Sequence, residues 1–275
     1  MKIVVIGGSG LIGSKLVNKL REYGHEAVPV SPNTGVNTLT GEGLTEVLKG
    51  ASVVVDVSNS PSFEETVAMN FFTTATPNLL RYGQAAGVRH HVALSVVGTD
   101  RLAENRPSDA ENTIRGYFRA KLAQEKLIAE SSIPFSIVHA TQFFEFFKNI
   151  ADTSSDSTTV RLAPVLIQPM AAEDVARAVG RIAVGTPVNG IVEIGGPEQF
   201  RLDEFIRKGL LARNDSRKVV ADPAAGYFGV EVDEYTLVPG KNARLGETRF
   251  ETWLTQTAQP TANSEFSANA VATSR

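Results

Sequence analysis

Short apolar runs alternate with stretches in which apolar residues recur every three or four positions. The runs are rich in Val and Ile and end in Gly, Ser or Thr, which indicates strands buried on both faces. The stretches between them indicate amphipathic helices that close at glycines such as Gly24 and Gly87. This alternation predicts an α/β fold with a doubly wound parallel sheet. The predicted strands are 2–7, 26–31, 52–60, 90–98, 134–140 and 189–196, and the predicted helices are 11–24, 43–50, 63–86, the one holding Tyr117, 171–185 and 201–213.

A glycine-rich segment joins the first strand to the first helix. It reads GGSGLIG, in which Gly8, Gly10 and Gly13 match G-x-G-x-x-G, and Gly7 begins an alternative G-x-x-G-x-x-G. Glycines let the backbone turn sharply and approach a pyrophosphate, while the helix N-terminus offers free N–H groups and a partial positive charge. The context predicts a Rossmann dinucleotide site, although a tight turn without ligand is the alternative. Its expected residues are Gly7, Gly8, Ser9, Gly10, Leu11, Ile12 and Gly13.

The segment after the second strand bears on the choice of cofactor. It reads VSPNTG, with Ser31, Asn33 and Thr34 as donors and without the Asp or Glu that binds the ribose 2′-hydroxyl of NAD. We therefore expect NADP rather than NAD, although the loop has no Arg or Lys to pair with the 2′-phosphate. Ser58 and Asn59, at the end of the strand at 52–60, are expected to contact the cofactor. Asn59 and Ser60 are expected on its adenosine side, or as turn residues.

Residues 117–121 read YFRAK and place a tyrosine and a lysine four positions apart. On a helix these positions share one face, so Tyr117 and Lys121 point the same way. Hydride transfer to a carbonyl needs a proton donor, and a nearby ammonium lowers the pKa of a tyrosine from about 10. We therefore predict Tyr117 as the proton donor and Lys121 as the group that lowers its pKa. The alternative is an ordinary solvated helix face.

Four segments together resemble the atypical branch of the short-chain dehydrogenase/reductase superfamily, with its NmrA-like and triphenylmethane-reductase-like proteins. They are GGSGLIG, NLLRYGQAAGVRHHVALS (78–95), YFRAK and QPMAAEDVARAV (168–179). The resemblance covers about residues 1–200. It implies that Ser95 donates to the developing oxyanion near the nicotinamide, that Lys121 also holds the nicotinamide ribose, and that Asp174 heads a helix.

Two positions depart from the family pattern. The strand end LSVVG keeps Ser95 but lacks the Ser/Thr run of the sugar-nucleotide epimerases. His139 stands where relatives often carry an Arg. The oxyanion role of Ser95 is therefore less strongly indicated than the Tyr-Lys pair.

Composition narrows the function classes. The chain has no cysteine, and its four histidines do not form a zinc-like ligand pair, so we expect no metal site. The net charge of −3 indicates no attraction to nucleic acids or membranes. No apolar run approaches the ~20 residues that cross a bilayer, so the expected protein is soluble and cytoplasmic.

The predicted organisation is a cofactor-binding Rossmann domain over 1–150, a part over 151–254 that completes the sheet and forms a small substrate-covering lobe, and a disordered tail over 255–275. The aromatic run QFFEFF (142–147) would line an apolar pocket, with Phe143 and Phe147 on one helical face, or pack in the core. Trp253 is expected to anchor the C-terminal element.

The predicted function is reduction of a carbonyl or polarised double bond of a small apolar or aromatic molecule, with NAD(P)H as cofactor. Two alternatives are open. One is an NmrA-like regulatory protein that senses the dinucleotide without turnover. The other is a sugar-nucleotide epimerase or dehydratase.

Overall fold

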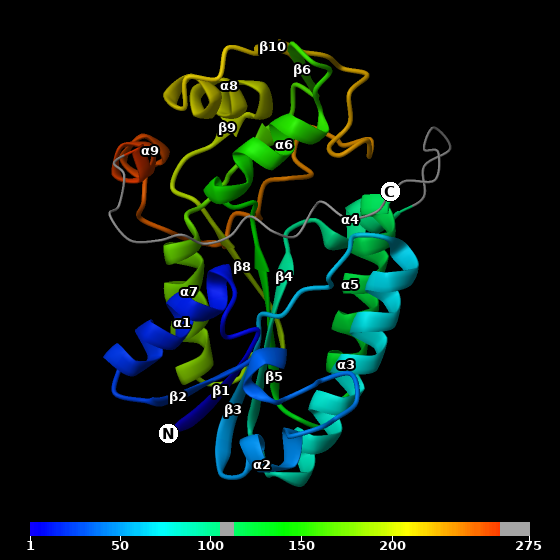
Figure 1. Cartoon of the computed structure of the whole chain (residues 1–275), viewed down its shortest axis with the longest axis vertical. Helices are drawn as coiled ribbons and strands as arrows, with labels where there is room; N and C mark the ends of the chain where they lie inside the picture. The colour runs from blue at the N-terminus through cyan, green and yellow to red at the C-terminus, as the bar shows by residue number, and fades with distance from the viewer. Residues whose placement is uncertain (105–112, 259–275) are drawn as a thin grey trace.

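A seven-stranded parallel sheet forms the centre of the molecule (Figure 1). The computed structural model describes residues 1–104 and 113–258. The strand order is β11-β8-β5-β4-β3-β1-β2, which confirms the predicted doubly wound sheet. Its strands are β1 (Lys2–Ile6), β2 (Glu26–Val30), β3 (Ala51–Asp56), β4 (His90–Val96), β5 (Phe135–Ala140), β8 (Gly190–Gly195) and β11 (Arg244–Leu245).

Helices cover both faces of this sheet (Figure 1). Helices α1 and α7 pack together on one face, and α3 and α5 pack together on the other. The helices of this layer are α1 (Leu11–Glu22), α2 (Leu44–Leu48), α3 (Glu65–Ala85), α4 (Thr99–Ala103), α5 (Thr113–Ala129) and α7 (Ala172–Val184), with a 3₁₀ turn at Pro32–Thr34.

The first strand shows why four apolar residues follow Lys2 without alternation. Ile3 and Val5 pack in the cluster shared with α1 and α7, whereas Val4 and Ile6 pack in the cluster shared with α2 and α3. All four side chains are almost fully buried. Burying each such side chain stabilises the fold by about 1.5–3 kcal/mol, so a strand buried on both faces contributes on both sides of the sheet.

A smaller lobe lies beyond the carboxyl edge of the sheet (Figure 1). It has a two-stranded parallel sheet, β10 with β6, and an antiparallel pair, β7 with β9. The predicted domain boundary at 150 falls inside α6. The lobe elements are 3₁₀ turn η2 (Phe144–Phe146), α6 (Phe147–Thr153), β6 (Thr159–Leu162), β7 (Leu166–Ile167), β9 (Phe200–Arg201), α8 (Leu202–Ala212), β10 (Lys218–Ala221) and α9 (Phe250–Ala258).

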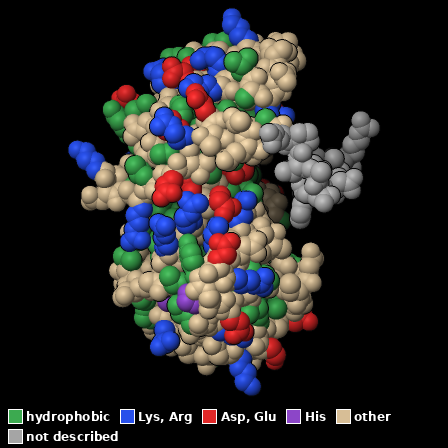
Figure 2. All heavy atoms as spheres, turned by 90° about the vertical axis from the view of Figure 1, so that its left-hand side faces the viewer, with side chains coloured by type: hydrophobic (Ala, Val, Ile, Leu, Met, Phe, Trp, Pro, Cys, Tyr) green, Lys and Arg blue, Asp and Glu red, His purple; other side chains and the backbone are tan. Residues whose placement is uncertain are grey.

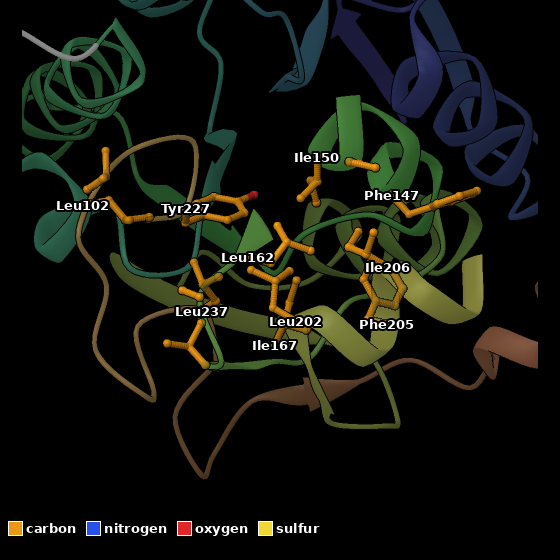
Figure 3. Packing of buried hydrophobic residues seen from close by; sticks show 14 of the residues in the cluster. Leu102, Phe147, Ile150, Leu162, Ile167, Leu202, Phe205, Ile206, Tyr227 and Leu237 are labelled. Carbon is orange, nitrogen blue, oxygen red and sulfur yellow. The ribbon is translucent and has the colours of Figure 1, made fainter. Parts of the chain in front are cut away.

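The apolar core of this lobe is continuous with the Rossmann part (Figure 3). Leu102 of α4 and Tyr117 of α5 belong to the same cluster as Tyr227 and Leu237. Trp253 packs on the rings of Phe144, Phe147 and Phe250, which confirms its predicted anchoring role. The lobe is therefore fixed against the carboxyl ends of the strands.

Three local predictions were wrong. The strand at 52–60 ends at Asp56, so Ser58 and Asn59 lie in the following loop. Phe143 has an extended backbone and precedes the helical turn, so Phe143 and Phe147 do not share a helical face. Residues 255–258 belong to α9 rather than to the tail, because its helix continues to Ala258. The rest of the predicted tail lies outside the described residues.

Candidate dinucleotide site and active site

The backbone conformation of the glycine loop requires glycine at two positions, Gly7 and Gly13. Gly7 has a φ of +77°, and its N–H donates to the Val30 carbonyl over 2.9 Å. A Cβ on Gly13 would lie 2.0 Å from the Gly7 carbonyl oxygen, so any side chain there would displace the loop. Gly10 differs, since a Cβ there would meet just the Gly7 oxygen at 3.3 Å. Packing alone does not require a glycine at position 10, whereas close approach of a ligand would.

The start of α1 is suited to an anion. Gly10 is its N-cap and supplies no side-chain hydrogen bond, and the first turn contains no acidic residue. Ser9, Gly10 and Leu11 are exposed, while Ile12 and Gly13 are buried beneath them. The first-turn N–H groups and the positive end of the helix dipole therefore face an open surface. This loop fits a pyrophosphate.

A second buried polar atom lies at the end of β2. Ser31 is 8% exposed and forms a capping box with Thr34, whose N–H faces the Ser31 side chain, while the Ser31 hydroxyl proton has no acceptor among the described residues. Thr34 folds back, donating to the Ser31 carbonyl over 2.8 Å, and Asn33 is exposed. Residues 31–34 carry no carboxylate. The Ser31 hydroxyl fits the adenosine ribose or its 2′-phosphate, so both ends of this region suit NAD(P).

Tyr117 is placed on the sheet by α5 and lies under the loop that follows β3. Its Oη donates to Asn59 Oδ1 over 2.9 Å. The ring is 9% exposed and is contacted edge-on by Phe63, with centroids 5.0 Å apart. Burial raises the pKa of Tyr117 above its ordinary value of 10.0, so the phenol is neutral at physiological pH. Asn59 therefore contacts the predicted proton donor.

Lys121 does not act on Tyr117 in this structure. Its Nζ donates to the Leu94 carbonyl oxygen over 2.8 Å and to the side chain of Gln124, and it lies 4.6 Å from the Phe72 ring centroid. Burial lowers the pKa of Lys121 to about 8, although Asp56 and Glu125 favour its charged form. The predicted lowering of the tyrosine pKa by Lys121 is thus absent here, because burial dominates and the ammonium is bound elsewhere.

Asp56, at the end of β3, is linked by hydrogen bonds to Ser58 and, through Gln124, to Lys121. Its carboxylate accepts from the Ser58 N–H over 3.0 Å and the Ser58 hydroxyl over 2.6 Å. It also accepts from Gln124 Nε2 over 3.0 Å, and Gln124 in turn accepts from Lys121. The Ser58 hydroxyl is therefore used within the protein. The sequence signal for this network is a carboxylate, Asp56, that ends an apolar strand, and it was not among the predicted site residues.

The hydrogen-bond partners of Ser95 are residues other than Tyr117. Its hydroxyl donates to Glu125, two helical turns beyond Tyr117 on α5, and lies 3.5 Å from the Thr99 hydroxyl. Glu125 also pairs with His139 Nε2 over 3.1 Å. The structure thus forms a buried Ser95–Glu125–His139 cluster between β4, β5 and α5. It does not bring Ser95 to the phenol, as the oxyanion role would require.

Three other features of the described residues can be compared with this site: a groove, a charged face and possible metal ligands. A groove of about 760 Å³ runs between α5 and strands β5 and β8, but no glycine-loop residue lines it. On the face of α1 and α7, cationic side chains alternate with carboxylates (Figure 2), and Lys15 and Lys19 both pair with Glu173. Within residues 1–104 and 113–258, no cluster of three or more His, Asp or Glu could hold a metal ion. No helix in those residues combines the length and apolarity of a membrane span.

Comparison with solved structures supports the same fold. A short-chain dehydrogenase/reductase superfamily protein from Agrobacterium tumefaciens with bound NAD has a TM-score of 0.66 at 16% identity, covering 94% of this chain and 96% of that one. RMD from Pseudomonas aeruginosa, complexed with NADPH, gives 0.66 at 14% identity, covering 92% and 96%. The dTDP-4-dehydrorhamnose reductase from Bacillus anthracis, in complex with NADP, gives 0.63 at 15% identity, covering 90% of each chain. One of these structures contains NAD, and the other two contain NADP or NADPH.

Sequence comparison supplies the family. The chain is 21% identical over 159 residues to the photosystem II assembly factor Ycf39 of Synechocystis sp., covering 53% of this chain. It spans about half, 46%, of the length of that relative. The family model described as NAD(P)H-binding matches residues 7–184, which is more than half of the chain. The chain therefore belongs to the NAD(P)H-binding family within the atypical short-chain dehydrogenases/reductases.

Proposed function

We propose that the protein is an NADP(H)-dependent reductase that delivers a hydride and a proton to a carbonyl, or another polarised double bond, of a small apolar or aromatic molecule. The observation that carries the proposal is the Tyr117 hydroxyl, neutral and held as a donor at the carboxyl edge of the sheet beside a dinucleotide cradle. NADPH, when bound, supplies the hydride. Tyr117 supplies the proton to the oxygen that becomes negative.

Asn59 has a positioning role in this proposal. Its Oδ1 accepts from both the Tyr117 hydroxyl and the Ser60 N–H, which holds the phenol in its protonated form. Reduction needs a proton at this atom before the hydride arrives, so a neutral tyrosine suits that direction. Because burial raises the pKa of Tyr117 and Lys121 is bound elsewhere, the phenol proton leaves only when the negative charge develops on the substrate oxygen.

The aromatic surroundings of Tyr117 support an apolar substrate. The Tyr117 ring has edge contacts with the rings of Phe63, Phe72 and Phe118, and Phe63 is 51% exposed. Exposed rings beside a polar donor are typical of sites that hold a largely apolar molecule by one polar group. We therefore expect quinones and aromatic aldehydes or ketones to be better substrates than sugars.

Cofactor preference follows from Ser31. A 2′-phosphate near Ser31 meets no carboxylate from residues 31–34 and can accept from the Ser31 hydroxyl. NADP is therefore the proposed cofactor, with NAD as the weaker ligand.

A non-catalytic dinucleotide-binding role is the second candidate. It is favoured by the partners that Tyr117 and Lys121 already have within the protein, and by the assembly-factor name of the cyanobacterial relative. The test is NADPH consumption by the purified protein over a panel of quinones, aromatic aldehydes and ketones. The reductase predicts oxidation of NADPH with stoichiometric product. NADPH binding without consumption across the whole panel would favour the second candidate.

A further inference from the structure

Gln142 is a buried amide without a hydrogen-bond partner at the cofactor edge of the sheet. It follows β5 by two residues and is 7% exposed. Neither its Nε2 nor its Oε1 has a partner among the described residues. Buried amides are nearly always paired in native proteins, because leaving one unpaired destabilises the fold. This side chain therefore calls for an explanation.

The backbone around Gln142 is fixed, so its position is determined. Its carbonyl accepts from the Met170 N–H over 2.9 Å, and the Met170 carbonyl accepts from the Phe144 N–H over 2.9 Å. The neighbouring Thr141 N–H donates to the Ile194 carbonyl over 3.1 Å. The Thr141 hydroxyl is likewise buried without a partner among the described residues.

The place of Gln142 in the sheet points to the nicotinamide end of the cofactor. Strand β5 adjoins β4, and β3 separates β4 from β1, which carries the glycine loop. Ser31, at the end of β2, lies on the opposite side of that loop. A dinucleotide whose pyrophosphate lies at α1 extends both ways along the carboxyl edge. With its adenosine toward Ser31, its nicotinamide extends toward Tyr117 and Gln142.

Ser31 Oγ and Thr141 Oγ1 are also buried without a partner near this edge of the sheet, but each is a single hydroxyl rather than an amide, and further such atoms lie elsewhere. Thr76 lies inside α3, and His90 and His91 lie at the amino end of β4. Thr76 therefore lies outside the sheet, and His90 and His91 lie at the end of β4 opposite its carboxyl end. The absence of a partner does not by itself indicate a ligand site. Gln142 combines that absence with a fixed backbone and a position at the cofactor edge.

We propose that the side-chain amide of Gln142 binds the carboxamide of the nicotinamide. One edge of a primary amide presents one N–H donor and one carbonyl acceptor in the same plane, as does one edge of the carboxamide, so the two groups can form a pair of N–H···O hydrogen bonds. This pair fixes the rotation of the pyridine ring relative to Tyr117. The proposal rests on the dinucleotide site that the proposed reductase also uses, but not on turnover.

The test compares two ligands by equilibrium titration: NADP⁺ and 2′-phospho-ADP-ribose, which lacks the nicotinamide. Gln142→Leu should weaken NADP⁺ about tenfold, the loss expected for two neutral hydrogen bonds, and leave 2′-phospho-ADP-ribose within twofold. The ligand-free variant should melt at or above the wild-type temperature, because an unpaired buried amide is gone. The NADP⁺ analogue with an acetyl group in place of the carboxamide should bind the wild type more weakly than NADP⁺ does. The Gln142→Leu variant should bind this analogue and NADP⁺ with equal affinity.

Two results would overturn the assignment. Equal weakening of both ligands would make Gln142 a structural residue, and unchanged NADP⁺ affinity would remove it from the site. Wild-type protein that binds neither ligand would overturn the dinucleotide site itself. A protein that binds NADP⁺ as expected but reduces no substrate would contradict the reductase while leaving the role of Gln142 intact.

Discussion

Replacing Gly10 by alanine should separate ligand binding from folding. Gly10 has a φ of −77° and an extended ψ, which any residue adopts, and its added Cβ would meet one oxygen at 3.3 Å. Alanine is a poorer N-cap by up to ~1 kcal/mol, but it also restricts the unfolded chain by about 0.4–1 kcal/mol. We therefore expect the free energy of unfolding to change by less than about 1 kcal/mol.

The effect on the cofactor should be much larger. The new methyl group would lie on the exposed turn that precedes the first-turn N–H groups of α1. Losing one charge-assisted hydrogen bond to a phosphate costs about 1.5–3 kcal/mol, which corresponds to roughly a 10- to 150-fold rise in Kd. Thermal unfolding would measure the first effect, and fluorescence titration with NADPH the second.

Two control variants complete this experiment. Asn18→Ala, two turns further along α1 and exposed, should leave both readouts unchanged. Gly13→Ala should lower the melting temperature, because its Cβ would lie 2.0 Å from the Gly7 oxygen. A Gly10→Ala protein with wild-type affinity for NADPH would refute the reasoning, since the glycine would then serve neither packing nor a ligand.

Three further predictions concern acid stability, docking of the C-terminal segment and cofactor preference. Burial lowers the pKa of His91 to about 4, so as the pH falls below 6.5 the unfolded state binds a proton there before the folded state does, and the free energy of unfolding decreases. In urea titrations between pH 6.5 and 4, His91→Leu should make this decrease smaller, whereas His25→Leu should not. Asp174 accepts from the N–H groups of Glu247 and Thr248 over 3.0 and 2.8 Å; Asp174→Ala should cost about 2–4 kcal/mol by denaturant unfolding and Asp174→Asn less, and equal stability of all three proteins would be inconsistent with this docking. Ser31→Asp should reverse a preference for NADPH over NADH in binding titrations, and equal affinities of the wild type would contradict the preference.

The sequence predicted those features that depend on local patterns. The strand that begins at Lys2, the glycine loop and the helix of Tyr117 follow from spacing within a few residues of each other. The direction of each polar side chain depends on distant partners instead. The hydrogen bond from Tyr117 to Asn59 joins residues 58 positions apart in the sequence, and the one from Gln124 to Asp56 joins residues 68 positions apart.

The same reasoning explains what was missed in the lobe. Strands β7 and β9 have two residues each, too few to show an alternating pattern. The extended backbone at Phe143 is fixed by the Met170 segment, whose carbonyl accepts from the Phe144 N–H. Helical spacing of Phe143 and Phe147 could not reveal that contact, because it forms with a segment more than twenty residues away.

The turnover of Tyr117→Phe, compared with that of Tyr235→Phe, tests the central claim most directly. Tyr235 is 58% exposed and serves as the matched control. With a substrate found in the carbonyl panel, Tyr117→Phe should lower kcat about 10²- to 10⁴-fold, the range typical of general acid catalysis, and leave the NADPH Kd within about twofold. Tyr235→Phe should change neither. Wild-type kcat in Tyr117→Phe would contradict the account, because the proton would then come from another group.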